Sequence, residues 1–217
     1  MNAIRLFWLL FISLVSAQEI HATHIVGGEI TYRCLGNDQY EITLTVYRDC
    51  FNGKVPFDST ANIGIYQGGK DSVFLKLGLL YDETTNDTLP IILDNPCLVV
   101  PPGVCVHKAT YQTVLNLPYA PAGYTIAYQR CCRNELIRNI PFPLNTGISF
   151  IAEISGKAQL ECNSAATFNQ WPPVAICIHV PINFDHAASD PDGDSLRYRL
   201  CTPLNGPDFA HSVPDPP

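Results

Sequence analysis

The adjacent thiols of Cys131 and Cys132, in the stretch YQRCCRN, are the residues of this sequence with the clearest capacity for chemistry. Such a pair can bind a metal, act in catalysis or redox exchange, or form structural disulfides. No CxxC pair and no neighbouring histidine supports a zinc site, and a catalytic thiol needs a histidine partner that the stretch lacks. Structural disulfides are therefore the favoured interpretation, with Arg130 and Arg133 as surface or ion-pair residues.

The partners of this pair are predicted from strand geometry. Successive side chains of a strand point to opposite faces, so Cys131 and Cys132 should bond to two different cysteines. Cys34 and Cys50 are the candidates. Cys34 lies near the turn of a predicted hairpin and Cys50 lies far along its returning strand, so at about 3.4 Å per residue the two are too far apart to bond to each other.

The other cysteines of the nine are assigned by loop and by segment. Cys97 and Cys105 bracket LVVPPGV, a loop that can reverse at its Pro-Pro-Gly turn, and they are predicted to bond to each other. Cys162, Cys177 and Cys201 belong to the later part of the chain, where one is left without a partner.

A cluster of three carboxylates, Asp190, Asp192 and Asp194, lies in the stretch DPDGD. Oxygen ligands of this type attract calcium, and alternate residues of an extended segment share one face. The order differs from an EF-hand loop, and a plain solvated turn made by Pro, Asp and Gly is the alternative. The sequence thus predicts a weak calcium site here, at the junction of two β-units.

The remaining polar residues indicate no catalytic centre. The six histidines show no ligand spacing, and the sequence has no nucleophile elbow, no H-E-x-x-H and no phosphate-binding glycine loop. We therefore expect no catalytic residue, no cofactor-binding residue and no enzymatic activity. A net charge of −7 with 15% charged residues gives no basic stripe for nucleic acid or anionic lipid.

The first residues predict the compartment. One arginine, an apolar run from Leu6 to Val15 and small residues ending at Ala17 are typical of a secretory signal peptide, residues 1–17, with cleavage as late as Ala22 as the alternative. An exported chain with nine cysteines is expected to form disulfides. No later stretch is long and apolar enough for a membrane span.

Strand signals dominate the rest of the chain, where 18 prolines oppose helices. The clearest is the alternation in residues 40–47, which forms a predicted hairpin with residues 25–31. Short strands with regular turn signals predict an all-β fold, an immunoglobulin-like sandwich. The further strands are expected at residues 62–66, 72–77, 104–115, 124–132, 148–154, 176–184 and 195–200.

The polar, proline-rich stretch NSAATFNQWPP predicts a domain boundary. The expected sandwich covers residues 22–157, a linker covers 158–173, and residues 174–217 begin a second, truncated β-sandwich unit of cadherin-like or PKD-like type. That unit has room for too few strands to complete a sandwich of about seven. Downstream domains of the same chain are therefore expected.

Several segments together resemble the amino-terminal region of large Bacteroidetes surface proteins of the gliding-motility-associated kind: ATHIVGGEITYRCLGNDQYEITLTVYRDC, PPGVCVHKATY, AGYTIAYQRCCRN and CNSAATFNQWPPVAICIHVPINFDHAASDPDGDSLRYRLCTP. The resemblance covers most of residues 22–203. It implies export, followed by type IX secretion to the cell surface, and repeated immunoglobulin-like or PKD-like domains. It supplies no catalytic residues.

The expected function is non-catalytic: cell-surface adhesion or scaffolding, with an extracellular protein or glycan as the ligand. The alternative is the amino-terminal binding region of a secreted hydrolase whose catalytic domain lies downstream. Further β-repeats and a sorting domain in the extended reading frame would favour the first, and a catalytic motif the second.

Overall fold

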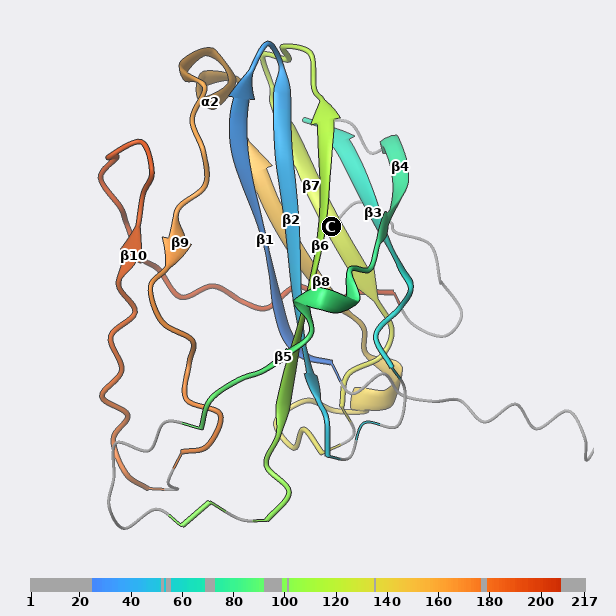
Figure 1. Ribbon diagram of the computed structural model, residues 1–217, viewed down its shortest axis with the longest axis vertical. Helices are drawn as coiled ribbons and strands as arrows, with labels where there is room; N and C mark the ends of the chain where they lie inside the picture. Colours follow the sequence, from blue (N-terminus) through green and yellow to red (C-terminus); the bar gives the residue numbers. More distant parts are fainter. Residues whose placement is uncertain are drawn as a thin grey trace, which may run out of the picture.

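The computed structural model describes residues 25–51, 53, 56–68, 73–91, 99–100, 102–134, 136–176 and 179–207. The predicted signal peptide, Cys97 and Cys177 lie outside the described residues. The fold is an all-β sandwich of two four-stranded antiparallel sheets, as the sequence predicted (Figure 1). None of the helices in the described part of the chain has the length and apolar character of a membrane span.

The first sheet grows from the hairpin that the alternating sequence predicted. Tyr40, Ile42 and Leu44 are at most 1% exposed, and the residues between them are partly exposed. The hairpin reverses at Gly36, Asn37 and Asp38, which all have positive φ. The order of strands in this sheet is β1 (Ile25–Gly36), β2 (Gln39–Asp49), β6 (Val106–Asn116) and β5 (Asp87–Thr88).

The second sheet contains four of the other predicted strands. Its order is β4 (Val73–Leu80), β3 (Thr60–Gln67), β7 (Tyr124–Arg130) and β8 (Ile148–Ile154). A β-bulge interrupts the β3–β4 register between Ile65 and Tyr66. Short 3-10 helices at Glu83–Thr85 and Pro143–Asn145 lie in the connections.

The core lies between the two sheets. Buried side chains from both sheets fill it, including Ile42 and Leu44 from β2 and Ile63 and Ile126 from β3 and β7. The sheets approach closely where β1 passes β8, because Gly28 has no side chain. A Cβ at Gly28 would lie 2.5 Å from the Phe150 ring and 2.7 Å from the Thr45 carbonyl.

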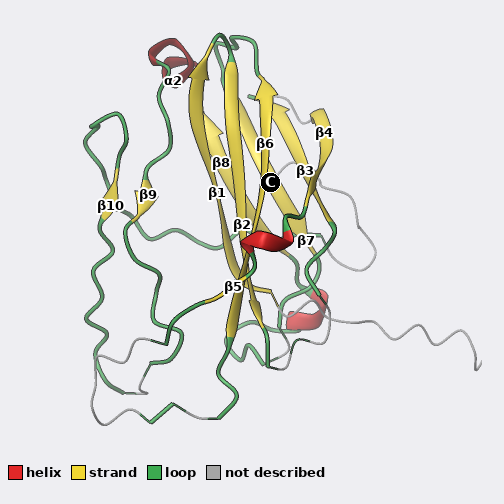
Figure 2. Ribbon diagram, viewed as in Figure 1, coloured by secondary structure: helices red, strands yellow, loops and turns green. Residues whose placement is uncertain are grey.

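The chain leaves the sandwich at Ile154 and enters a short helix, α2 (Gly156–Glu161), which the proline-rich sequence did not indicate. The helix begins where the Ser155 side chain caps the Ala158 N–H. We call the following residues 163–207, as far as they are described, the arm. Figure 2 shows the arm mostly as loop, standing beside the sandwich.

The arm differs from the second β-unit that the sequence predicted. Its described residues form strands only at β9 (Thr167–Phe168) and β10 (Ala188–Ser189), which pair with each other. The strands predicted at 176–184 and 195–200 are wrong, since the described residues of both segments have no strand structure. Among the described residues no second sheet packs on these segments, so alternation alone does not produce strands there.

Candidate functional site

Cys131 and Cys132 form a disulfide with each other, with their Cα atoms 3.1 Å apart across a cis peptide bond. The prediction that they bond to Cys34 and Cys50 is therefore wrong. The prediction assumed that both residues belong to a strand, whereas β7 ends at Arg130. Opposite-facing side chains are a property of extended strands, so the argument does not apply beyond that residue.

Cys50 bonds to Cys105 instead, with Cα atoms 5.3 Å apart, so the predicted Cys97–Cys105 bond is also wrong. Strand β2 pairs along its whole length with β6, and its last pair is Asp49 with Val106. This register brings the next residue of each strand, Cys50 and Cys105, side by side, and the Cys50 N–H donates to the Cys105 carbonyl at 3.1 Å.

Cys34 bonds to Cys162, the C-cap residue of α2, with Cα atoms 5.4 Å apart. Cys34 does lie near the hairpin turn and Cys50 at the far end of β2, as the sequence indicated. Cys201 is exposed and forms no disulfide with the described residues. It lies on a shallow hollow of about 920 Å³ in the arm, beside His186 and Leu200.

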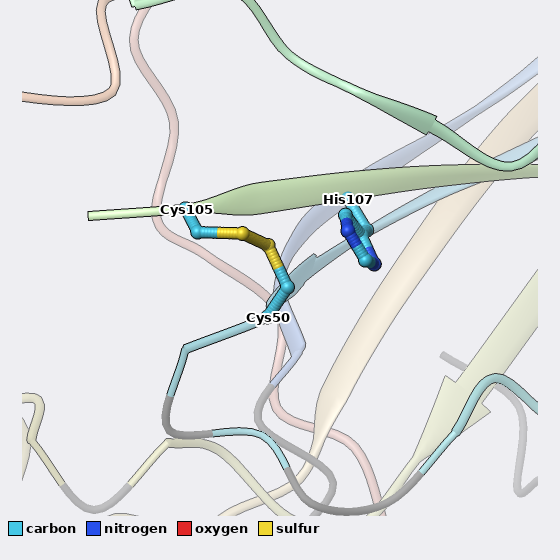
Figure 3. A group of neighbouring side chains, drawn as sticks. All are labelled: Cys50, Cys105 and His107. Carbon is cyan, nitrogen blue, oxygen red and sulfur yellow. A yellow bond between two sulfur atoms is a disulfide. The ribbon is translucent and has the colours of Figure 1, made fainter. Parts of the chain in front are cut away.

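His107 lies directly beside the Cys50–Cys105 disulfide, as Figure 3 shows. One atom of each of these residues lies within 4.8 Å of the others, a group that the spacing of the histidines in the sequence did not indicate. Both sulfur atoms are bonded to each other, so they are not thiolate ligands in this state. The Arg48 guanidinium Nη2 lies 3.4 Å from His107 Nδ1. The Cys50–Cys105 disulfide of this group therefore links the ends of β2 and β6 covalently.

The three aspartates predicted to bind calcium lie together in a tight turn, where Gly193 has φ +79°. One Asp190 carboxylate oxygen accepts the backbone N–H groups of Asp192 and Asp194, at 2.9 and 3.0 Å. Asp192 Oδ2 accepts the Ser164 N–H at 2.6 Å. These hydrogen bonds close the turn and join it to Ser164.

This acidic turn binds the start of the arm at Ser164, whose Oγ accepts the Cys34 N–H of β1 at 3.2 Å. Besides the Asp192 contact, Asp194 Oδ2 accepts the Asn163 side-chain amide at 2.5 Å. The nearby Tyr32 hydroxyl has a raised pKa, chiefly because it is buried and further because of electrostatic interactions with Tyr40 and with the carboxylates of Asp190 and Asp192. The carboxylates of the turn therefore influence the pKa of a tyrosine in the sandwich. Calcium binding at the turn stays a prediction.

A groove of about 620 Å³ lies over the second sheet. Polar side chains from three neighbouring strands line it: Asn62 from β3, Lys76 from β4 and Gln129 from β7. Cys131 and Pro207 also lie along it. Gln129 Nε2 donates to Ser149 Oγ at 3.1 Å, while its Oε1 accepts no hydrogen bond from the described residues. The amide and ammonium groups can form hydrogen bonds with a ligand, beside apolar lining from Ile63 and Leu77.

The arginines on either side of the vicinal disulfide have structural partners. Arg130 forms an ion pair with Asp58. Arg133 is only 7% exposed, and its guanidinium donates to the carbonyls of Gly147 and Leu204 at 2.9 and 3.0 Å. Burial lowers the pKa of both guanidinium groups, yet both stay charged at neutral pH because arginine is so strongly basic. Arg133 thus joins the end of the arm to the sandwich.

The comparisons with known proteins add no relative. Neither a protein-family model, a curated protein nor a solved structure matches the chain. The functional argument therefore depends on the residues and geometry described above.

Proposed function

We propose that this protein is an exported, non-catalytic module of a cell-surface protein, in which the disulfide-stapled sandwich presents a binding surface for adhesion or scaffolding. The observation that carries the proposal is the set of three disulfides in the described part of the chain, one after β2, one after β7 and one at α2. Disulfides of this kind persist in oxidising compartments and are rare in the cytosol.

The groove over the second sheet supplies the contact surface. It is built on strands, which hold Asn62, Lys76 and Gln129 at fixed spacing, and rigid elements position a binding site more accurately than loops do. Its amide groups both donate and accept hydrogen bonds. An extracellular protein or a glycan is the class of ligand that matches this chemistry.

Location is tested on intact cells that produce the protein. A protease that cannot cross membranes should cleave the protein, and non-reducing peptide mapping should recover the Cys34–Cys162 and Cys50–Cys105 bonds. A cytoplasmic protein in the same sample, which must stay uncleaved, is the control. Recovery of the chain from the cytoplasm with reduced thiols contradicts the proposal.

Binding is tested on arrays of glycans and extracellular proteins. The double variant Asn62→Ala, Gln129→Ala removes two amides from the groove and should lose at least tenfold in affinity for the ligand found. Gln112→Ala removes an exposed amide from β6 of the other sheet and should bind as the wild type does. If the groove variant binds equally well, the groove is not the contact surface.

A further inference from the structure

Two of the four outer edges of the two sheets are covered by the arm, and a third edge, β5, is a strand of only two residues. At β1, the Ala165 N–H donates to the Tyr32 carbonyl at 2.8 Å. At β8, the Ser149 hydroxyl donates to the Asn205 carbonyl at 2.7 Å. The short strand β5 pairs with β6 on the remaining side of the first sheet. Covering of this kind prevents a sheet from pairing with foreign strands.

Strand β4 is the fourth edge, and among the described residues no strand pairs with its outer side. Its apolar side chains are unusually exposed: Phe74 by 47%, Leu75 by 39% and Leu80 by 74%. Its bulge lies at the Phe74 end, so the stretch from Leu75 to Leu80 keeps a regular register with β3. A regular, apolar, uncovered edge is a template for strand addition.

The register shows which backbone groups face outward. The Tyr81 N–H donates to the Ser59 carbonyl at 3.0 Å, so residues 59 and 81 exchange ladder hydrogen bonds. Bonded and non-bonded pairs alternate along an antiparallel ladder. Leu79 and Leu77 therefore face β3 with their backbone groups, whereas the N–H and C=O groups of Lys76, Gly78 and Leu80 point toward the open edge.

We propose that β4 pairs antiparallel with β4 of a second copy of this chain, about a two-fold axis at Leu77. This register sets outward-facing Lys76 against outward-facing Gly78 of the second copy, so that their N–H and C=O groups meet. It also brings the second copy's strand alongside Leu80, the most exposed apolar side chain of β4, whereas Phe74 points to the other face of the sheet, where its ring lies 5.5 Å from that of Tyr124.

Charge argues for the same register. Lys76 is the single charged residue of β4, and a lysine on an edge normally opposes pairing because two copies would place like charges opposite each other. With the axis at Leu77, each Lys76 lies across from a glycine instead. A strand of another protein would need its own complementary sequence, whereas this strand already complements itself.

Association is measured first on the oxidised full chain without any ligand. The result therefore does not depend on whether the groove over the second sheet binds a ligand. Sedimentation or light scattering at increasing concentration should show a shift from the monomer mass to about twice that mass. Lys76→Pro removes an N–H that faces the open edge and not the ladder to β3, so it should reduce dimer affinity at least tenfold while unfolding at nearly the wild-type temperature. Lys76→Ala keeps that N–H and should still dimerise.

A cross-link tests the register independently of the proline variant. Residues at the two-fold axis form a non-hydrogen-bonded pair with Cα atoms about 4.5 Å apart, within the range of a disulfide. Leu77→Cys should therefore yield a covalent dimer joined at residue 77. Lys76→Cys is more exposed but lies about 7 to 8 Å from its own copy, and it should cross-link far less. A wild-type chain that stays monomeric, or a Lys76→Cys chain that cross-links as well as Leu77→Cys, overturns the proposal.

Discussion

The sandwich and the arm are built from similar residues, yet only one of them has a core. In the sandwich, Leu44, Ile65 and Ile126 are completely buried between the sheets. In the arm, apolar side chains face solvent, with Ile182 61% and Leu200 103% exposed. The difference shows that alternation of apolar and polar residues produces a strand only where a second layer covers the apolar face.

The arm is held by separate polar anchors instead. At its start lie the Cys34–Cys162 disulfide and the bonds from the Cys34 N–H to Ser164 Oγ and from the Ala165 N–H to the Tyr32 carbonyl. At its end lie the bonds that the Leu204 and Asn205 carbonyls accept. Loss of one anchor should therefore release a part of the arm, whereas loss of one core side chain should weaken the whole sandwich.

The largest expected effect is in the core. Leu44→Ala should lower the free energy of unfolding by about 2 to 5 kcal/mol, since it leaves a cavity between the sheets. The same change in the arm, Leu200→Ala, should stay within about 0.5 kcal/mol because the side chain is exposed. Urea unfolding followed by fluorescence measures both. Equal losses would mean that the arm also packs on a core.

The sandwich should also be the more sensitive region at alkaline pH. Burial raises the pKa of Tyr111 to about 12, with a smaller contribution from Tyr81. Above pH 10 the unfolded chain releases this proton while the folded chain keeps it, so stability falls as pH rises from about 10 to 12. The loss from Tyr111 should reach about 2 to 3 kcal/mol at the end of that window.

The variant Tyr111→Phe tests whether the alkaline loss of stability comes from Tyr111. The variant loses the hydrogen bond from the hydroxyl to the Asp58 carbonyl, 2.8 Å long, and should be about 1 kcal/mol less stable at neutral pH. Its further loss between about pH 10 and 12 should be smaller than that of the wild type. An unchanged alkaline loss would assign the effect to other groups.

Arg133, which joins the arm to the sandwich, allows a further test of the difference between these two regions. Arg133→Met leaves the Gly147 and Leu204 carbonyls without their donor, which should cost about 1 to 3 kcal/mol. Hydrogen exchange should accelerate in residues 204–206 and on neighbouring Ile148, more than in the distant strand β2. Arg199→Met, an exposed arginine of the arm, is the control, and a uniform acceleration in both variants would contradict an anchoring role.

The smallest expected effect is that of calcium on the acidic turn. With the dissociation constant near 10⁻³ M expected of extracellular modules, about 5 mM calcium should stabilise the chain by about 1 kcal/mol. The double variant Asp192→Ala, Asp194→Ala should lose that increment. Calorimetry with and without calcium compares the two proteins, and equal increments would leave DPDGD as a turn that holds Asn163 and Ser164.

Local patterns in the sequence were sufficient for the hairpin and for the faces of its strands, because burial of Tyr40, Ile42 and Leu44 follows directly from alternation. The disulfide partners were not predictable in this way. Cys50 meets Cys105 because β2 lies next to β6, a pairing between strands far apart in the chain. Sequence spacing contains no information about such neighbours unless the strand order is known.

The candidate site also has some features that the sequence predicts and others that it does not. The turn at Asp190 follows from its own Pro, Asp and Gly residues, and the structure has it. The groove over the second sheet requires Asn62, Lys76 and Gln129 to lie on adjacent strands, and each looks like an ordinary outward-facing polar residue in the sequence. The sequence predicts a surface or ion-pair role for Arg133, whereas the side chain is buried, because the carbonyls that accept its hydrogen bonds come from distant loops.

The bond between Cys34 and Cys162 also has a mechanical consequence for a chain that is stretched between its ends. The two cysteines are 128 positions apart in the sequence, so nearly the whole sandwich lies within one covalently closed loop. Tension applied before Cys34 and after Cys162 passes directly through the sulfur atoms and bypasses strands β2 to β8. At about 3.3 to 3.6 Å per residue, the loop withholds roughly 420 to 460 Å of contour length, which is released in full only when the Cys50–Cys105 bond inside the loop is reduced as well. A single-molecule stretching experiment should show the full extension only after both disulfides are reduced.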